Sequence, residues 1–267
     1  MSTPIIVCGA AGRMGRTLVQ LVHQHPDTTL RAAVEAANHP WLGRDVGEIA
    51  GLGTVGVRVT DDYAGAVAAD AVTLDFTIPA ATLDHLRTAA ATVAPIVIGT
   101  TGYNEAEQAE LDRLAPQTRA VVASNMSVGV NVLLKLVTTA AAILGPDFDP
   151  EIVEIHHRLK VDAPSGTALA LGRAVAGALG RDLRRDARYG REGVVGKRTN
   201  QEIGIMALRG GDAVGDHTVI FAGLGERLEL THRSQSRDCL ARGALRAALW
   251  VVGQPVGRYS MMDVLGL

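Results

Sequence analysis

The chain has 267 residues, enough for one large or two ordinary domains, and 47% of them are hydrophobic, which excludes a disordered chain. Its formal charge is −2 and its lysines and arginines are scattered, so no basic block predicts binding to nucleic acid or to a membrane surface. Aromatic residues make up only 3%, too few for a surface that stacks single-stranded bases.

The cysteine content indicates a reducing compartment. Cys8 and Cys239 are far apart in the sequence and form neither a disulfide framework nor a zinc motif. Residues 1–4 lead directly into an apolar run, without the charged segment and apolar core of a secretory signal. No stretch of about 18 uninterrupted apolar residues occurs. We therefore expect a cytoplasmic protein with no membrane span and no bound metal.

Short apolar runs alternate with helical patterns over the first 125 residues. The runs expected to form strands are 5–8, 30–34, 71–78, 96–98 and 119–123. Apolar residues recur at helical spacing between Met14 and Val22, and Asn104 with Glu107 resembles a capping box that opens another helix. Strands that alternate with helices predict an α/β fold with a doubly wound parallel sheet.

The first strand meets a glycine turn, Gly9-Ala10-Ala11-Gly12-Arg13-Met14-Gly15, which opens the first helix. This order of strand, turn and helix leaves backbone N–H groups where a pyrophosphate can lie. Glu35 ends the second strand, 20 residues past Gly15, where its carboxylate can accept hydrogen bonds from ribose hydroxyls. The alternative is a tight turn without a ligand and a surface glutamate.

A second turn, Gly99-Thr100-Thr101-Gly102, follows the fourth predicted strand. The carboxyl ends of the strands line the ligand crevice of a doubly wound sheet, so these residues can contact the nicotinamide half of a dinucleotide. Without the first glycine turn, this segment would equally fit an ordinary turn.

The pattern changes after Ser127 to that of an α+β domain with an open, mixed sheet. An apolar helix is expected over 130–144, since Gly145-Pro146 is a stop signal. The remaining expected elements are a strand over 151–158, a helix from about Thr167, β-like runs at 203–208, 218–221 and 227–231, and a last helix over 238–252. We therefore expect a dinucleotide-binding domain at 1–126, completed by 237–267, and a substrate-binding and oligomerisation domain at 127–236.

The segment from Glu154 to Thr167 places His156, His157 and Lys160 at the end of a strand, just before a helix. In an extended strand the two histidines point to opposite faces, so they cannot do the same work. Ser165, Gly166 and Thr167 are expected to form an N-cap cluster whose N–H groups, with the Lys160 ammonium, could converge on a carboxylate. The alternatives are a strand end with one buried imidazole and a solvated lysine. A metal site is not expected, because no further histidine or cysteine lies at ligand spacing.

Together these stretches resemble the dihydrodipicolinate reductase family, the 4-hydroxy-tetrahydrodipicolinate reductases. The most specific match is His-His-x-x-Lys-x-Asp-Ala-Pro-Ser-Gly-Thr at 156–167, and 124–131 and 244–250 match as well. The resemblance implies hydride transfer from NADH or NADPH to a cyclic imine-forming dicarboxylate in lysine and diaminopimelate biosynthesis. It also implies a homotetramer assembled through the C-terminal sheets.

The resemblance also implies a role for each matching residue. His156 resembles the proton donor, and Lys160 a second acid that also anchors a carboxylate. The residues that resemble the substrate binders are His157, Ser165, Gly166 and Thr167. The residues that resemble the cofactor site are Gly9, Ala10, Ala11, Gly12, Arg13, Met14, Glu35, Gly99, Thr100, Thr101, Ala123, Ser124, Asn125 and Met126.

Two departures from the family concern the cofactor. Met126 stands where many members have phenylalanine, and Ala36-Ala37 stand where members that accept NADPH often have arginine. Since Glu35 would repel a 2′-phosphate, NADH is the expected preference, with NADPH as the poorer substrate. Two other functions stay open: a nicotinamide dehydrogenase acting on a different amino or keto acid, and a redox sensor that binds dinucleotide without turnover.

Overall fold

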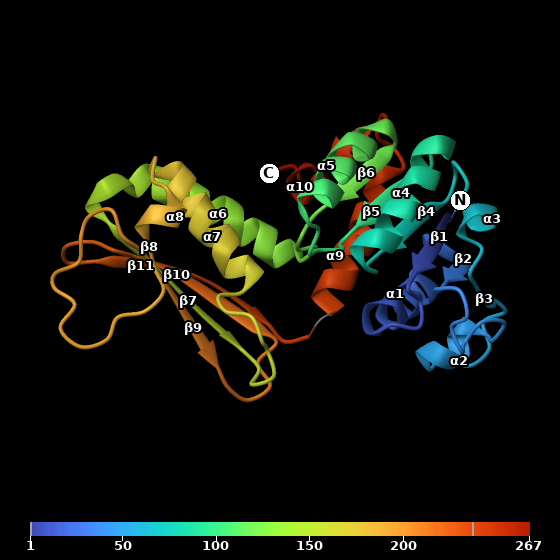
Figure 1. Cartoon of the computed structure of the whole chain (residues 1–267), viewed down its shortest axis with the longest axis horizontal. Helices are drawn as coiled ribbons and strands as arrows, with labels where there is room; N and C mark the ends of the chain where they lie inside the picture. Colours follow the sequence, from blue (N-terminus) through green and yellow to red (C-terminus); the bar gives the residue numbers. More distant parts are fainter. Residues whose placement is uncertain (1, 237) are drawn as a thin grey trace. The chain divides into compact units, whose positions relative to one another are not determined.

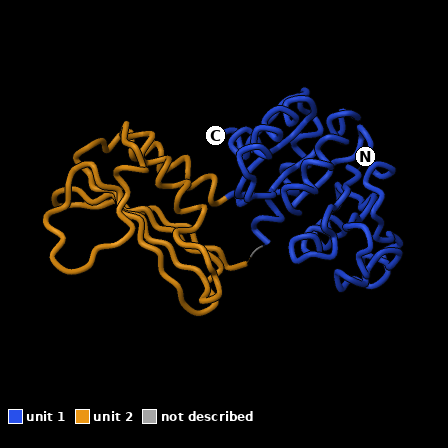
Figure 2. Tube along the Cα trace, viewed as in Figure 1, with its two compact units in different colours: residues 1–128, 238–267 blue, residues 129–237 orange. Residues whose placement is uncertain are grey.

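The computed structural model describes residues 2–236 and 238–267, which form two compact units. Among the described residues, one unit contains 2–128 and 238–267, and the other contains 129–236 (Figure 2). We refer to them as the N-terminal and C-terminal units.

The N-terminal unit contains the predicted parallel sheet, which has seven strands in the order β12-β6-β5-β4-β1-β2-β3 (Figure 1). Its strands are β1 (Thr3–Cys8), β2 (Thr28–Val34), β3 (Val59–Thr60), β4 (Val72–Asp75), β5 (Ile96–Ile98), β6 (Arg119–Val122) and β12 (Gly257–Tyr259). The chain winds outward from β1 in one direction and from β4 in the other. The crevice at such a reversal is where doubly wound sheets bind ligands.

The short edge strands β3 and β12 were not expected from the sequence. The expectation for the third strand was also too long, since β4 ends at Asp75 and not at residue 78. The Asp75 side chain accepts a hydrogen bond from the Thr77 N–H at 3.0 Å, so the backbone turns there.

Helices cover both faces of this sheet. They are α1 (Arg13–Gln24), α2 (Val46–Ala50), α3 (Tyr63–Ala66), α4 (Pro79–Thr92), α5 (Glu105–Leu114), α9 (Asp238–Val251) and α10 (Met261–Leu265), with the 3-10 turn η1 (Ala115–Gln117). One core contains residues of α1 and α9 packed on the sheet, and another contains residues of α4 and α5 on strands β5 and β6. The capping box of Asn104 and Glu107 is present at the start of α5, as predicted.

The C-terminal unit contains a five-stranded mixed sheet with the order β11-β10-β7-β9-β8. Its elements are α6 (Val128–Leu144), η2 (Gly145–Asp147), β7 (Asp149–His156), α7 (Gly166–Ala178), α8 (Leu183–Asp186), β8 (Ala187–Arg188), β9 (Ile203–Arg209), β10 (Gly215–Ala222) and β11 (Arg227–Ser234). The helices lie on one face of the sheet (Figure 1). Buried and half-buried residues alternate along β10, because only one face carries that cover.

The α6 helix and the following turn η2 together are long and apolar enough to cross a membrane, judged by length and composition alone. Within the segment Val128–Asp147, an 18-residue window has a mean hydropathy of 1.8, and 28% of this window is buried. Length and composition are weak grounds for a membrane span, because a core helix satisfies the same test. Here Leu133, Val137 and Ala141 pack with α7 and the sheet in the core of the C-terminal unit, and Lys135 interrupts the apolar sequence.

The β7 strand ends at His156, two residues earlier than predicted. The Lys160 N–H bonds to the His157 carbonyl at 3.1 Å, so the chain already turns at His157. His157 thus lies outside the strand. The prediction that the two histidines point to opposite faces assumed that both lie in the strand, and this assumption was wrong.

Candidate active site

The glycine turn after β1 has little room for side chains. Gly9 has a φ of +67°, which favours glycine, and the Gly12 N–H bonds to the Gly9 carbonyl at 2.9 Å. A Cβ on Gly15 would lie 2.0 Å from the Gly9 carbonyl oxygen. The turn therefore needs glycine at Gly9 and Gly15, and it leads directly into the N-terminus of α1. This geometry fits the pyrophosphate of a dinucleotide.

Glu35 follows β2 and reaches back to this turn. Its Oε1 accepts a hydrogen bond from the Ala11 N–H at 2.8 Å, and its Oε2 accepts one from the Ala36 N–H at 3.2 Å. A hollow of about 430 Å³ opens beside it. The residues that line this hollow are Gly9, Ala11, Gly12, Val34, Glu35, Ala36, His39, Phe76, Thr77, Ile78, Ala81 and His85.

The other residues expected at the cofactor do not line this hollow. Ala10 is buried, and Arg13 and Met14 lie in the first turn of α1. Gly99, Thr100 and Thr101 follow β5, where a Cβ on Gly99 would lie 2.0 Å from the Phe76 ring.

The four residues expected to complete the cofactor site follow β6, at the same carboxyl edge of the sheet. Ser124 is exposed, and Ala123 and Asn125 are half-buried. The Met126 side chain is fully buried in the core of the N-terminal unit. Its packing in that core does not present it as a wall for nicotinamide.

Asp75, which the sequence analysis did not single out, organises the edge after β4. Its buried carboxylate accepts hydrogen bonds from the Thr77 and Thr82 hydroxyls, and its Oδ2 lies 2.6 Å from His85 Nδ1. Burial alone would raise the pKa of Asp75, but the His85 contact and the threonine bonds hold it below the ordinary value. The Thr100 hydroxyl joins this group at 2.8 Å from Thr82 Oγ1.

Asp75 and His85 also bring the thiol of Cys8 into a group whose ligand-type atoms lie within 4.8 Å of one another. Burial, and next the charge of Asp75, raises the pKa of Cys8 well above its ordinary value. Because the Asp75 oxygens are already hydrogen-bonded, we assign no metal to this group. The sequence signal for the site was available: polar Asp75 and Thr77 fall at the end of the strand beside β1.

In the C-terminal unit, His156 rests against a buried carboxylate. His156 Nδ1 lies 2.5 Å from Glu154 Oε2, and Glu154 is 0% exposed. Arg209 Nη1 donates to both Glu154 oxygens at 3.0 Å, and the Ser165 N–H donates to Oε1 at 3.1 Å. Burial alone would raise the pKa of Glu154, but these hydrogen bonds hold it below the ordinary value.

A second imidazole, that of His217 on β10, packs against the first. The ring centroids of His156 and His217 are 5.2 Å apart, edge to face, and His217 Nε2 shares a hydrogen bond with Ser165 Oγ at 3.0 Å. Burial, and next the charge of His156, lowers the pKa of His217 to about 4. Ser165 also caps α7, because its Oγ accepts a hydrogen bond from the Ala168 N–H. Its hydroxyl is therefore committed to the fold.

The remaining predicted substrate residues lie around the start of α7. Lys160 Nζ pairs with Asp162 Oδ1 at 2.7 Å, and its charge contributes to the lowered pKa of His217. Gly166 is exposed and Thr167 is half-buried at the helix N-terminus. The structure thus brings His156, Lys160 and Ser165 into one cluster, to which it adds Glu154, Arg209 and His217.

Comparison with known families accounts for both units. The N-terminal model of dihydrodipicolinate reductase matches residues 3–126, and the C-terminal model matches residues 129–265. The chain belongs to the dihydrodipicolinate reductase family. It is accordingly a reductase with the fold of a nicotinamide-dependent enzyme.

Full-length relatives agree with this assignment. The chain is 51% identical over 263 residues to a 4-hydroxy-tetrahydrodipicolinate reductase of Pelobacter propionicus, covering 98% of each chain. It is 52% identical over 267 residues to that of Alkalilimnicola ehrlichii, covering 100% of each. A dipicolinate-bound dihydrodipicolinate reductase from Paenisporosarcina sp. TG-14 shares the fold, with a TM-score of 0.76 at 24% identity and coverage of 98% and 99%.

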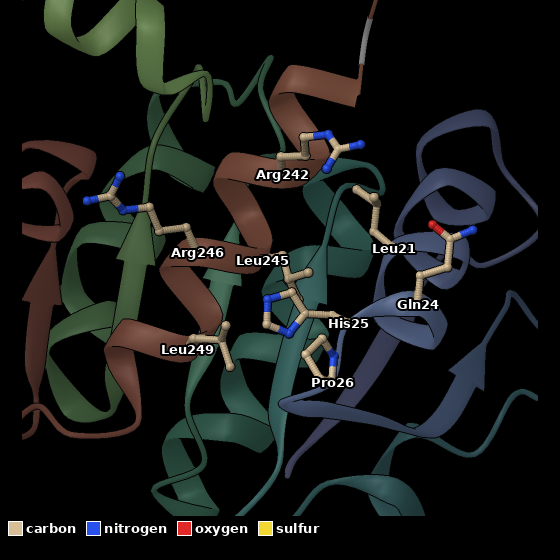
Figure 3. Close-up of a pocket in the computed structure, with 8 residues that line it drawn as sticks. All are labelled: Leu21, Gln24, His25, Pro26, Arg242, Leu245, Arg246 and Leu249. Atoms are coloured by element: carbon tan, nitrogen blue, oxygen red, sulfur yellow. The ribbon is translucent and has the colours of Figure 1, made fainter.

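One further hollow, of about 510 Å³, lies between α1 and α9 in this reductase (Figure 3). Leu21, Leu245 and Leu249 give it an apolar lining, and Arg242 and Arg246 stand at its rim. The two guanidinium groups point in different directions, so they do not converge on one anion (Figure 3). The hollow shares no residue with the glycine turn or the His156 cluster.

Proposed function

We propose that this protein reduces the dihydrodipicolinate formed from 4-hydroxy-tetrahydrodipicolinate to tetrahydrodipicolinate, with NAD(P)H, in lysine and diaminopimelate biosynthesis. The observation that carries the proposal is the His156 cluster beside Lys160 and the N-terminus of α7, in a chain of this family. The names of the relatives support the reaction. The dipicolinate bound to the Paenisporosarcina reductase supports a small cyclic dicarboxylate as the substrate class.

The C-terminal unit would bind the dicarboxylate and supply the proton. The Lys160 ammonium and the N–H groups of Gly166 and Thr167 favour anions, and His157 would add a further contact. Lys160 is 19% exposed, and Asp162 holds it until a substrate carboxylate competes. Hydride addition to the conjugated double bond leaves an electron pair on a ring carbon. The His156 imidazolium would donate its proton to that carbon and become neutral.

The N-terminal unit would hold the dinucleotide. NADH or NADPH, when bound, supplies the hydride. The glycine turn from Gly9 to Met14 would hold the pyrophosphate, and Glu35 would exchange its bond to the Ala11 N–H for the ribose hydroxyls. We assign the nicotinamide side to the segments after β5 and β6, residues 99–101 and 123–125.

We further propose that NADH is the preferred cofactor. Glu35 would repel the 2′-phosphate of NADPH, and Ala36 and Ala37 offer no guanidinium to offset that repulsion. Arg13 in the glycine turn and His39 at the hollow are the cations that could compensate partly. NADPH would therefore be the poorer substrate.

The open face of the C-terminal sheet supports the proposed homotetramer. The half-buried Val153, Ile155 and Ile220 face away from the helices, because their neighbours Ile152 and Val219 are buried in the core beneath α6 and α7. A second copy of the sheet would remove these side chains from water. We propose a cytoplasmic location, which the two widely separated cysteines support.

The deciding experiment is NADH oxidation with substrate made freshly from pyruvate and aspartate semialdehyde by a synthase. Rapid oxidation with this substrate, and none with a panel of other amino and keto acids, supports the proposal. Turnover of a panel member instead would favour another nicotinamide dehydrogenase. Cofactor binding without any oxidation would favour a dinucleotide sensor and refute the proposal.

A further inference from the structure

We propose that Glu154 and Arg209 are positioning residues that keep the hydrogen on His156 Nδ1, so that Nε2 is the atom that delivers the proton. The inference rests on the proposed role of His156 as proton donor. Neither residue was singled out from the sequence, and both act through His156 without touching the substrate themselves.

The buried carboxylate of Glu154 is held by three hydrogen-bonding groups. Its two oxygens accept hydrogen bonds from the Ser165 N–H, from Arg209 Nη1 and from His156, and the residue is 0% exposed. An unpaired buried carboxylate would take up a proton, so the guanidinium opposite it keeps it ionised. An ionised carboxylate only accepts hydrogen bonds, so the His156 nitrogen facing it must carry the hydrogen.

Arg209 is itself fixed in place. Its Nη1 donates to the Leu208 carbonyl and its Nη2 to the Asp162 carbonyl, each at 2.6 Å. The guanidinium therefore links three parts of the site: the end of β9, the turn that carries Lys160, and the carboxylate of Glu154. Because these are backbone contacts, Arg209 is a structural cation and not a mobile surface charge.

The second nitrogen of His156 lies where only glycine leaves space. A Cβ on Gly215 would lie 2.8 Å from His156 Nε2, and the ring of His217 packs edge to face against His156. The His156 side chain is 12% exposed. With Nδ1 committed to Glu154, Nε2 is the nitrogen left for the substrate.

Glu154 is the negative charge in direct contact with His156. The other titratable or charged groups around the cluster are Arg209 on β9, His217 on β10, His232 on β11, and Lys160 with its partner Asp162 in the turn after β7. Arg209 and Lys160 both oppose a positive charge on His156. Loss of the Glu154 charge should therefore destabilise the imidazolium form of His156.

The variant Glu154→Gln tests this at nearly constant shape. In the native structure Oε1 accepts from the Ser165 N–H and Arg209, so the glutamine oxygen should take this position. The glutamine NH₂ would then face His156 Nδ1 and demand an acceptor. Neutral His156 should consequently move its hydrogen from Nδ1 to Nε2, and its imidazolium form should be disfavoured.

Two measurements on the full-length protein test this change in His156. Long-range ¹H–¹⁵N NMR, with His156 assigned by comparison with His156→Gln, should show hydrogen on Nδ1 in the native protein and on Nε2 in Glu154→Gln. The descending limb of kcat against pH should move about 1–3 pH units lower in the variant. The substrate KM should change less than threefold, and Glu154→Asp should restore part of kcat.

The matched control is Glu202→Gln, which also removes a buried, arginine-paired carboxylate from the C-terminal unit. It should leave both the tautomer and the pH profile unchanged. An unshifted profile and an unchanged tautomer in folded Glu154→Gln would overturn the proposal. If Glu154→Gln does not fold, the tautomer of neutral His156 in the native protein decides. Hydrogen on Nε2 overturns the proposal, and hydrogen on Nδ1 supports it. If the chain fails to turn over the substrate, the proposed function fails, while the NMR comparison still decides the positioning role.

Discussion

Mild acid should weaken the C-terminal unit through its buried histidines, above all His217. This residue is 4% exposed, and burial, with the His156 charge second, lowers its pKa from 6.5 to about 4. Between these values the unfolded chain binds a proton at His217 and the folded chain does not. The stability contributed by neutral His217 is thus complete above the unfolded pKa and is lost as the pH falls toward 4.

The size of the effect follows from the pKa difference. A shift of about 2.5 units corresponds to about 3 kcal/mol over the whole window, of which about 2 kcal/mol is lost between pH 7 and pH 5. Glu154 and Asp162 have lowered pKa values, so their carboxylates remain ionised at pH 5. Burial also lowers the pKa of His232 on β11, so the change over this range should report on His217 together with His232.

Native-state hydrogen exchange of the β10 amides, corrected for intrinsic rates, measures the free energy of opening within the C-terminal unit. Tryptophan fluorescence would not serve, because Trp41 and Trp250 both lie in the N-terminal unit. His217→Gln should lower stability at pH 7 but lose much less between pH 7 and pH 5. His23→Gln, at an exposed position on α1, should respond like the unmodified protein. Equal β10 opening free energies at the two pH values in the unmodified protein would refute the reasoning.

Four further outcomes are expected. Lys160→Met should lower kcat/KM about 100-fold or more with an unchanged NADH dissociation constant, and near-normal turnover would remove its assigned role. His156→Ala should mainly lower kcat and His157→Ala should mainly raise KM, so identical steady-state profiles would contradict the division of work. The kcat/KM for NADH should equal or exceed that for NADPH. Ala36→Arg should strengthen NADPH binding by about 1–3 kcal/mol. A clear NADPH preference in the unmodified protein would contradict this and point to Arg13 as the residue that holds the 2′-phosphate. Sedimentation should show about four chains per particle, and a stable, active monomer would count against the open sheet face as an interface.

The sequence by itself determined the features that depend on near neighbours. The strand, glycine turn and helix from Ile5 to Val22 could be read from an apolar run, a spacing and a helical period. The capping box at Asn104 and the long strands of both sheets followed in the same way. The family resemblance added the residues from 154 to 167, and the structure places His156, Lys160 and Ser165 in one cluster.

Tertiary structure decided which distant side chains complete each site. Arg209 lies 55 residues beyond Glu154, and His217 lies 52 residues beyond Ser165. Local periodicity states which face a residue occupies, but it does not state which strand pairs beside it. The pairing of β7 with β9 and β10 places Arg209 and His217 around Glu154. In water these charges would be solvated and independent. Inside the folded unit, burial makes each of them dependent on the partner that the sheet provides.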